Sequence, residues 1–122
     1  MKFLFVCVGN ICRSPMAEVI FSNLAKKYGR DDLVIKSAGT HAFDGADMAD
    51  LSKQALFECG EVLPETKFSA TQFVYSMNDE FDFVIDLREF DDPWGGDISD
   101  YIKACKTLQS FCKALYNERC KT

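Results

Sequence analysis

The apolar positions near the start of the chain change from a continuous run to a helical spacing. The run from Lys2 to Val8 is almost entirely apolar, which predicts a buried β-strand. From Met16 to Tyr28 the apolar residues recur every three or four positions, which predicts an amphipathic helix. Ser14 is expected to cap this helix, Pro15 to take its first position and Gly29 to follow its end. The chain therefore opens with a strand, a loop and a helix.

The next segments continue this alternation of strands and helices. Leu33 to Ala38 reads as a second short strand, and Asp47 to Cys59 as a second helix. Phe81 to Leu87 is the third clear strand. The stretch between this helix and the third strand has mixed signals, and we expect only a short helix near Ala70 to Ser76.

The last segment has its apolar residues at helical spacing from Ile98 to Tyr116, which predicts a long C-terminal helix. Cys105 and Cys112 belong to its buried stripe and are expected to act as small hydrophobic residues. The alternating elements predict an α/β fold. We expect a three-layer sandwich with a short, mostly parallel central sheet of three or four strands flanked by helices, and functional loops beyond the carboxyl ends of the strands.

Composition limits the size and the class of the protein. The 122 residues are 48% apolar and include 11 phenylalanines, so we expect one domain over residues 1–122. The formal net charge of -5 argues against nucleic acid as a partner. No apolar stretch approaches the ~20 residues that cross a bilayer, so we expect a cytoplasmic protein with no membrane partner.

The cysteines and the single histidine restrict the possible chemistry. None of the six cysteines forms a C-x-x-C pair, and we expect free, reduced thiols and no structural zinc. A Cys-His protease would have only His41 as its base. Nine carboxylates between Asp79 and Asp100 accompany a single basic residue, Arg88, and most of them should form a solvated acidic surface.

The loop "CVGNICRS" carries the clearest chemical signal. Cys7 ends the first strand, and Arg13 stands at the start of the helix. The backbone N–H groups of such an arc converge on one point and, with the helix dipole, bind a tetrahedral dianion. Gly9 is expected to allow a positive φ in this loop. The planar guanidinium of Arg13 would bind two oxygens of the same anion.

The same positive surroundings favour Cys7 as a nucleophile. They lower the pKa of a thiol from its usual value of about 8.5, which gives a thiolate at neutral pH. Ser14 is placed to donate a hydrogen bond to the sulfur. In the alternative interpretation Cys7 only ends a buried strand and Arg13 is a surface charge. The strand, glycine and helix start around the motif favour the nucleophile.

A thiolate that attacks phosphorus also needs a group that protonates the departing oxygen and later activates water. The segment "EFDDPWGGD" supplies Asp91 and Asp92 on a turn-forming loop before the last helix. We choose Asp92, because Pro93 follows it and begins a turn that could aim the carboxyl group at the first loop. Trp94 either belongs to the core or lines the entrance for a flat phenolic substrate.

Three motifs resemble the low molecular weight protein tyrosine phosphatases: "FVCVGNICRSPMAE", "SAGT" at Ser37 to Thr40, and "DPWGGD" at Asp92 to Asp97. The resemblance implies hydrolysis of phosphotyrosine in proteins through a cysteinyl-phosphate, with no metal or other cofactor. It implies Cys7 as nucleophile and Asp92 as general acid, with Trp94 where the family usually has a tyrosine at the substrate mouth. The implied cradle for phosphate or similar oxyanions, braced by Asn10 and with Ser14 supporting the thiolate, consists of Val8, Gly9, Asn10, Ile11, Cys12 and Arg13.

The resemblance also bears on regulation and on the substrate. Cys12 matches a loop cysteine that in the family forms a reversible disulfide with the nucleophile; alternatively it only fills the loop. A relative that removes phosphate from arginine tends to carry threonine where this chain has Ile11, which favours tyrosine. The physiological substrate and the oligomeric state are not predicted.

The sequence differs from the family in one respect and is also compatible with two other functions. Family members usually insert a helix and a fourth strand before the acid loop, whereas Phe81 to Leu87 is followed almost at once by Asp92. A thiol-type arsenate reductase would use the same loop, but it needs a further cysteine pair, and Cys59 is alone on its helix. A non-catalytic phosphoprotein-binding module would need neither Cys7 nor Asp92.

Overall fold

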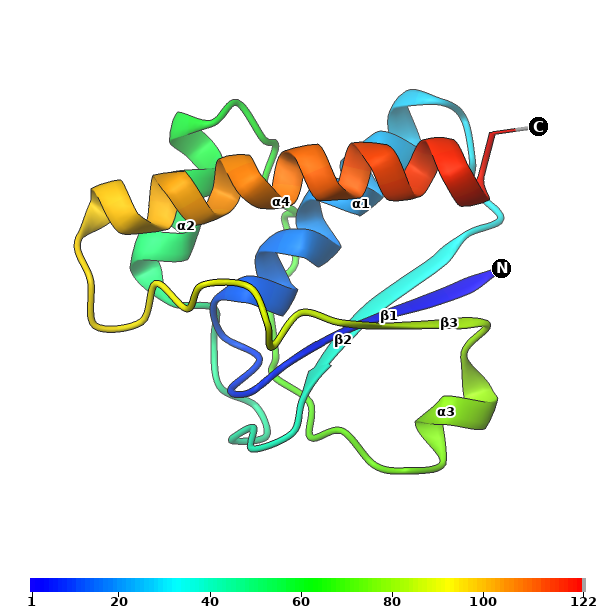
Figure 1. Cartoon of the computed structure of the whole chain (residues 1–122), viewed down its shortest axis with the longest axis horizontal. Coiled ribbons are helices and arrows are strands. Elements are labelled where there is room, and N and C mark those ends of the chain that lie inside the picture. The colour runs from blue at the N-terminus through cyan, green and yellow to red at the C-terminus, as the bar shows by residue number, and fades with distance from the viewer. Residues whose placement is uncertain (122) are drawn as a thin grey trace.

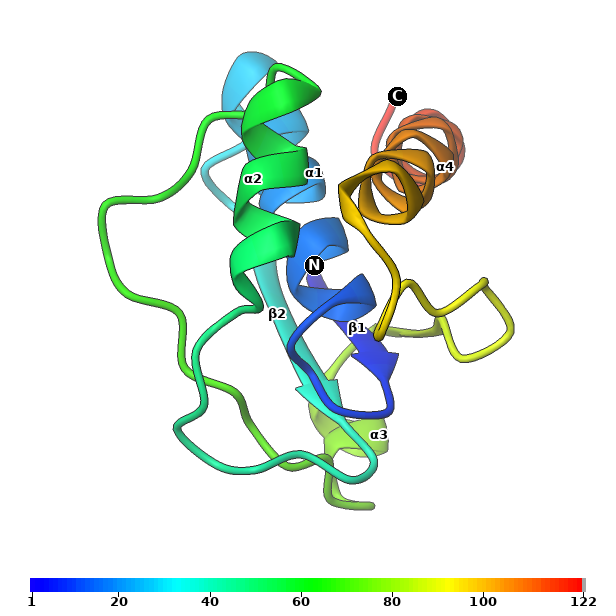
Figure 2. The ribbon, with the colours of Figure 1, turned by 90° about the vertical axis from the view of Figure 1, so that its left-hand side faces the viewer.

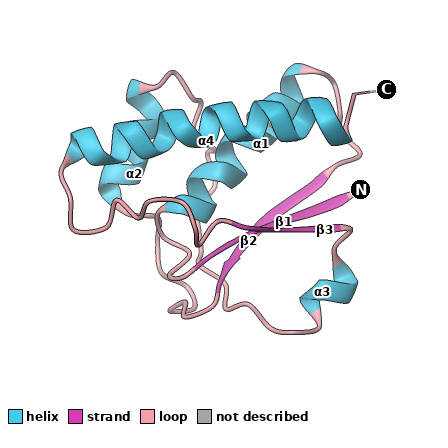
Figure 3. Ribbon diagram, viewed as in Figure 1, coloured by secondary structure: helices cyan, strands magenta, loops and turns pink. Residues whose placement is uncertain are grey.

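The computed structural model describes residues 1–121, which fold around a parallel sheet of three strands. These are β1 (Lys2–Cys7), β2 (Val34–Gly39) and β3 (Phe83–Asp86), in the spatial order β2-β1-β3 (Figure 3). Cys7 pairs with Gly39 at the end of β1. All three predicted strands are therefore confirmed, with β3 shorter than predicted.

The central strand β1 divides its side chains between two apolar clusters. Phe3 and Phe5 pack into the larger core on one face of the sheet, and Leu4 and Val6 into a smaller cluster on the other. The alternation follows from the strand geometry, in which successive side chains point to opposite faces. Because both faces are covered, the sequence of β1 is a nearly continuous apolar run.

Three helices cover one face of the sheet: α1 (Arg13–Lys27), α2 (Asp50–Glu58) and α4 (Ile98–Arg119) (Figures 1 and 2). The short helix α3 (Met77–Glu80) lies on the opposite face. Its layer is thin and consists of partly buried apolar side chains that pack on Leu4, Val6 and Ala38, namely those of Phe73, Met77, Phe81 and Val84. The predicted α/β sandwich is confirmed, with one thick and one thin helical layer.

The start of α1 differs from the prediction. The helix begins at Arg13 rather than near Met16, and its N-cap, Cys12, makes no side-chain capping bond. Ser14 lies inside the first turn and does not cap the helix. Its hydroxyl is instead bonded to Cys7 and Asn10.

The predicted helix near Ala70 to Ser76 is wrong. Gln72 forms a parallel bridge with Gly39, and the N–H of Phe73 donates to the carbonyl of Gly39 at 2.8 Å. This pairing extends the edge of the sheet beyond β2. A helix begins only at Met77.

The long C-terminal helix is confirmed. Asp97 caps α4, because its side chain accepts from the N–H of Asp100 while the Asp100 carboxylate accepts from the N–H of Asp97. Cys105 and Cys112 are fully buried, as predicted. No helix among residues 1–121 has the length and apolar character to cross a membrane.

The parallel arrangement gathers the loops that follow the strands at one end of the sheet. The loop after β1 covers residues 8–12, the loop after β2 begins at residue 40, and the loop after β3 begins at residue 87. These are the loops that carry the chemical motifs of the sequence. Functional loops are expected at this end of an α/β sheet.

Candidate active site

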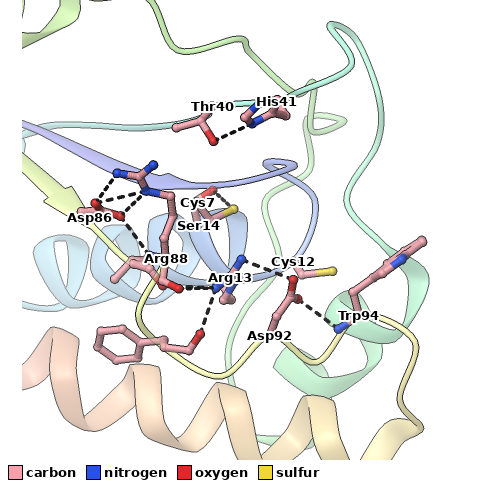
Figure 4. Close-up of polar contacts among 12 residues, drawn as sticks. Cys7, Cys12, Arg13, Ser14, Thr40, His41, Asp86, Arg88, Asp92 and Trp94 are labelled. Carbon is pink, nitrogen blue, oxygen red and sulfur yellow. Dashed lines mark hydrogen bonds and ion pairs between the residues drawn. The ribbon is translucent and has the colours of Figure 1, made fainter.

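Cys7 ends β1 and lies at the base of the first loop, where its side chain is 2% exposed. Its Sγ lies 2.9 Å from the Oγ of Ser14, in the first turn of α1 (Figure 4). The strand and the helix therefore fix the sulfur and its hydroxyl partner from two sides. The predicted contact between these two side chains is present.

The backbone of the first loop turns its carbonyl groups outward. The carbonyls of Cys7 and Val8 accept from the N–H groups of Thr40 and His41 at 2.9 and 2.8 Å. The Ile11 carbonyl accepts from the N–H of Ala49 at 2.9 Å. The N–H groups of residues 9–12 make no backbone hydrogen bond within the described part of the chain. Outward carbonyls and free amides are the arrangement that favours an anion inside the loop.

Asn10 holds the loop in this shape. It is fully buried and has a φ of 55°, in the left-handed region that asparagine tolerates better than most residues. Its Nδ2 donates to Ser14 Oγ at 2.8 Å and to Ser37 Oγ at 3.0 Å, and its Oδ1 accepts from the N–H of Thr71 at 2.9 Å. The expectation for Gly9 is wrong, because the positive φ of the loop belongs to Asn10.

Glu18 sets the direction of the hydrogen bond between Ser37 and Asn10. The Ser37 hydroxyl donates to Glu18 Oε1 at 2.7 Å, so it accepts from Asn10 Nδ2. Ser14 also accepts from Asn10, so its own proton can be donated to the Cys7 sulfur at 2.9 Å or to the Ala38 carbonyl at 3.4 Å. Burial raises the pKa of Glu18, and the hydrogen bond from Ser37 partly opposes this shift. Ser37 and Glu18 carried no signal of this role in the sequence.

Arg13 is 4% exposed and is held by backbone carbonyls. Its Nη1 donates to the carbonyls of Phe90 at 2.9 Å, Arg88 at 3.1 Å and Leu87 at 3.4 Å (Figure 4). The Arg88 side chain turns away and pairs with Asp86 at 2.8 Å. The Nε of Arg13 is buried without a hydrogen-bond partner among the described residues. An unsatisfied guanidinium nitrogen is costly unless a ligand accepts from it.

Asp92 reaches the first loop in spite of the short connection from β3. The chain turns directly after the strand, where the N–H of Phe90 donates to the Leu87 carbonyl at 3.0 Å. Asp92 Oδ2 then lies 3.3 Å from Arg13 Nη2, and its Oδ1 accepts from the N–H of Trp94 at 3.1 Å. The structure therefore brings together the carboxylate and the arginine that the sequence singled out.

Trp94 does not belong to the core. Its side chain is 65% exposed and, with Asp92, lines the mouth of a pocket of about 170 Å³. The pocket brings most of the predicted residues together and is lined by Cys7, Val8, Gly9, Ile11, Cys12, Arg13, Asp92 and Trp94. Asn10 and Ser14 lie behind this wall and contact the loop from the protein interior.

Cys12 is surrounded by hydroxyl groups that the sequence did not indicate. Its Sγ lies 3.5 Å from the Oη of Tyr101, on α4. The Ser52 hydroxyl, on α2, also faces this sulfur, outside the geometry of a full hydrogen bond. Burial raises the pKa of Cys12, whereas the hydroxyls of Tyr101 and Ser52 lower it; the negative charges of Asp92 and Cys7 add to the increase.

The features weighed for other functions lie apart from this pocket. His41 bonds to Thr40 at 3.1 Å and is exposed, and the only hydrogen-bonding side chain at the Cys7 sulfur among residues 1–121 is that of Ser14. Cys59 is the only cysteine at α2, but its thiol lies beside that of Cys105 on α4; neither residue lines the pocket. No group of three or more potential metal ligands occurs within the described residues.

Both the sequence and the fold of this chain are similar to those of known proteins. Residues 2–89 match the family described as low molecular weight phosphotyrosine protein phosphatase. This match includes the loop from Cys7 to Arg13 and ends before Asp92.

Individual relatives match different shares of the chain. A protein-arginine-phosphatase of Bacillus subtilis is 28% identical over 94% of this chain and 94% of its own. A low molecular weight protein-tyrosine-phosphatase PtpA of Staphylococcus saprophyticus is 32% identical over 70% of this chain and 53% of its own. The solved structure of a low molecular weight protein tyrosine phosphatase from T. tengcongensis has a TM-score of 0.85 and 26% identity, and it covers 97% of this chain and 99% of its own.

Proposed function

The chain belongs to the low molecular weight phosphotyrosine protein phosphatase family and is a phosphatase, and from this premise we propose that it hydrolyses phosphotyrosine in proteins through a cysteinyl-phosphate on Cys7. The observation that carries this proposal is the loop itself. The buried Cys7 sulfur, the loop amides that lack backbone partners and the Arg13 guanidinium belong to residues that line one small pocket, and the buried Arg13 Nε has no partner among the described residues. This set of groups complements a phosphoryl dianion bound next to a nucleophile.

In the first step the Cys7 thiolate attacks phosphorus, the S–P bond forms and the P–O bond to the tyrosyl oxygen breaks. The hydrogen bond from Ser14 supports the thiolate. The amides of residues 8–13 and the Arg13 guanidinium bind the equatorial oxygens, where charge is spread in the transition state. Asp92, in its protonated form, delivers a proton to the departing phenolic oxygen.

In the second step water attacks the cysteinyl-phosphate. Asp92, now a carboxylate, accepts a proton from this water while the S–P bond breaks and inorganic phosphate forms. The same group serves both steps, because the first step leaves it in the form that the second step requires. The position of Asp92 within 3.3 Å of Arg13 supports both assignments, since Arg13 would hold the phosphoryl group.

The mouth of the pocket favours an aromatic leaving group. Ile11 and the exposed Trp94 both line the pocket and offer apolar surface to a substrate. A flat phenol ring would bury this surface, whereas Asp92 is the one carboxylate that lines this pocket among residues 1–121. These features support tyrosine as the substrate residue.

Phosphoarginine is a second candidate substrate. It is favoured by the similarity to the protein-arginine-phosphatase of Bacillus subtilis, which extends over 94% of both chains. The match to the Staphylococcus protein-tyrosine-phosphatase covers 53% of that protein. The loop chemistry is the same for both substrates, so only the choice of leaving group separates them.

The test is a substrate panel with the reduced protein in the presence of EDTA. We expect hydrolysis of p-nitrophenyl phosphate and of a phosphotyrosine peptide, with slower release of phosphate from phosphoarginine and phosphoserine peptides. Cys7→Ser should abolish turnover and still bind phosphate. If the phosphoarginine peptide were hydrolysed faster than the phosphotyrosine peptide, the substrate would be phosphoarginine and not phosphotyrosine.

The same panel separates the rival functions. Phosphopeptide binding without turnover would indicate a binding module. Thiol-dependent reduction of arsenate without phosphatase activity would indicate an arsenate reductase. Loss of activity on chelation would contradict the metal-independent mechanism.

A further inference from the structure

Two buried hydroxyl groups converge on the sulfur of Cys12. The Tyr101 side chain is 2% exposed, and its Oη has Cys12 Sγ, at 3.5 Å, as its only hydrogen-bond partner among the described residues. Ser52 is fully buried, and its Oγ faces the same sulfur with no hydrogen-bond partner in the described part of the chain. Buried hydroxyl groups normally form hydrogen bonds. Here, among residues 1–121, two of them have no potential partner other than the Cys12 thiol, which requires an explanation.

A neutral thiol cannot satisfy both groups well. Sulfur in a thiol is a weak acceptor, and its single proton can serve only one hydroxyl. A thiolate can accept from both, and hydrogen bonds to a charged group are the stronger kind. The arrangement around Cys12 is therefore more complementary to the sulfur anion than to the thiol.

The Tyr101 phenol is suited to act as a permanent donor. Burial, the neighbouring Cys12 and the charge of Asp92 all raise its pKa, so it keeps its proton at neutral pH. The hydroxyls of Tyr101 and Ser52 oppose the burial that raises the pKa of Cys12. They thus offset part of the cost of forming a thiolate in a closed site.

We propose that Tyr101 and Ser52 are positioning residues that stabilise the Cys12 thiolate, so that it attacks Cys7 after Cys7 has been oxidised by a peroxide. The proposal rests on the proposed function through the role of Cys7 as a reactive thiolate. Both cysteines line the same pocket, which places the two sulfurs on one cavity.

The chemistry balances with one peroxide molecule. The Cys7 thiolate attacks hydrogen peroxide, the O–O bond breaks, and a sulfenic acid and hydroxide form. The Cys12 thiolate then attacks the Cys7 sulfur, the S–S bond forms and the S–O bond breaks. The departing hydroxide and the hydroxide from the first step take up the two thiol protons, so two thiols and one peroxide give one disulfide and two waters.

The competing reaction gives the proposal its measurable consequence. A sulfenic acid that is not attacked by Cys12 reacts with a second peroxide molecule to an irreversible sulfinic acid. A substitution that slows the attack of Cys12 on the Cys7 sulfenic acid should therefore increase the irreversible oxidation of Cys7. The hydroxyls of Tyr101 and Ser52 would protect the active site without touching the substrate.

The experiment compares wild type, Tyr101→Phe and Ser52→Ala. Each protein is exposed to hydrogen peroxide, quenched with an alkylating reagent and analysed by peptide mass spectrometry for the Cys7–Cys12 disulfide and for the Cys7 sulfinic acid. Tyr101→Phe should slow disulfide formation about tenfold, as expected for loss of one hydrogen bond to a charged group. Ser52→Ala should slow it by a smaller factor of more than twofold, because the Ser52 hydroxyl faces the sulfur without a full hydrogen bond. Both substitutions should raise the sulfinic fraction. Activity before peroxide treatment should be unchanged.

Tyr116→Phe is the matched control, because Tyr116 is also buried on α4 but packs against Phe21 and Tyr28. It should retain the wild-type disulfide rate. Combined with Cys12→Ala, the substitutions at Tyr101 and Ser52 should have no further effect on the sulfinic fraction. This readout separates their action through Cys12 from a general loosening of the fold.

Two results would overturn the proposal. The first is a wild-type protein that forms no Cys7–Cys12 disulfide. The second is a wild-type protein that forms it at a rate that Tyr101→Phe and Ser52→Ala leave within twofold. The second result leaves the proposed phosphatase mechanism intact. Failure of that mechanism would appear separately, as absence of turnover in the substrate panel, while the mass spectra would still report on Cys12.

Discussion

The Asp92 carboxylate lies 3.3 Å from the Arg13 guanidinium, at the mouth of the pocket that contains the Cys7 sulfur. The Arg13 side chain is 5% exposed and that of Asp92 is 47% exposed, so the pair joins a fixed cation to a partly solvated anion. A bound oxyanion would compete with Asp92 for Arg13. Binding of an oxyanion and the position of the loop that carries Asp92 should therefore be coupled.

Trp94 offers a direct measurement of this coupling. It is the only tryptophan of the 122 residues, it is 65% exposed, and its backbone N–H donates to the Asp92 carboxylate. Phosphate or vanadate that displaces Asp92 from Arg13 should change the surroundings of the indole ring. We expect a saturable change in tryptophan fluorescence on titration with either anion.

The matched variant for this titration is Cys7→Ser, which should give the same saturable change with phosphate because it removes the nucleophile and leaves the amides in place. Arg13→Ala should abolish the change. A fluorescence signal that does not saturate, or that persists in Arg13→Ala, would contradict coupling through the Arg13–Asp92 pair.

Asp92→Asn tests the role of the general acid. General acid catalysis contributes ~10²–10⁴-fold, and it matters most when the leaving group is a strong base. We therefore expect kcat/KM to fall at least about 100-fold for phenyl phosphate and much less for aryl phosphates whose phenols are acidic. The measurement is a plot of log kcat/KM against leaving-group pKa, which should be steeper for the variant, because kcat/KM reports only the steps up to departure of the phenol. Equal slopes for the two proteins would remove Asp92 from this role.

The sequence was sufficient for the parts of the site that local structure determines. The strand to Cys7, the loop and α1 follow one another directly, and the apolar pattern indicated this order, although α1 begins earlier than predicted, at Arg13. It placed Asp92 on the correct loop because a turn motif precedes a long amphipathic helix. These features depend on neighbours in the chain.

The remaining features depend on contacts between distant residues. Asn10 binds the N–H of Thr71, 61 positions away, and Cys12 contacts Tyr101, 89 positions away. The predicted helix after Ala70 failed for the same reason, because residues 72 and 73 pair with Gly39 at the edge of the sheet. The local sequence does not predict a pairing with a distant residue. Helix propensity is a weak preference, and tertiary contacts override it.

Gly39 permits the closest backbone approach in the site. A Cβ at this position would lie 2.5 Å from the Val8 carbonyl oxygen and 2.8 Å from the Asn10 nitrogen, both in the first loop. Gly39→Ala must therefore displace the loop, at a cost of about 1–3 kcal/mol in the free energy of unfolding. Because the loop amides would shift, kcat/KM for p-nitrophenyl phosphate should also fall at least tenfold, by analogy with small misplacements of catalytic groups, which cost ~10²-fold.

Gly9→Ala is the comparison for this substitution. Its Cβ would meet only Ile11 Cγ1 at 3.6 Å, an ordinary contact, and Gly9 has no positive φ. Urea denaturation should show an unfolding free energy within about 0.5 kcal/mol of wild type. If Gly9→Ala were the more destabilising of the two, the close approach at Gly39 would not be the constraint that shapes the loop.

Glu18 should make the stability of the fold depend on pH. Burial raises its pKa above the usual 4.5, so the native state holds this proton more tightly than the unfolded chain. For a carboxyl group shifted in this direction, the free energy of unfolding is greatest below the unfolded pKa and falls as pH rises through the native value. Glu18→Gln cannot ionise and retains an oxygen that accepts from Ser37. Its stability, measured by urea denaturation from pH 4.5 to neutrality, should fall less steeply than that of wild type.

Glu58→Gln is the control, because it alters an exposed carboxylate on α2, and it should follow the wild-type curve. Parallel curves for wild type and Glu18→Gln would show that the Glu18 carboxyl group titrates alike in the folded and unfolded chain.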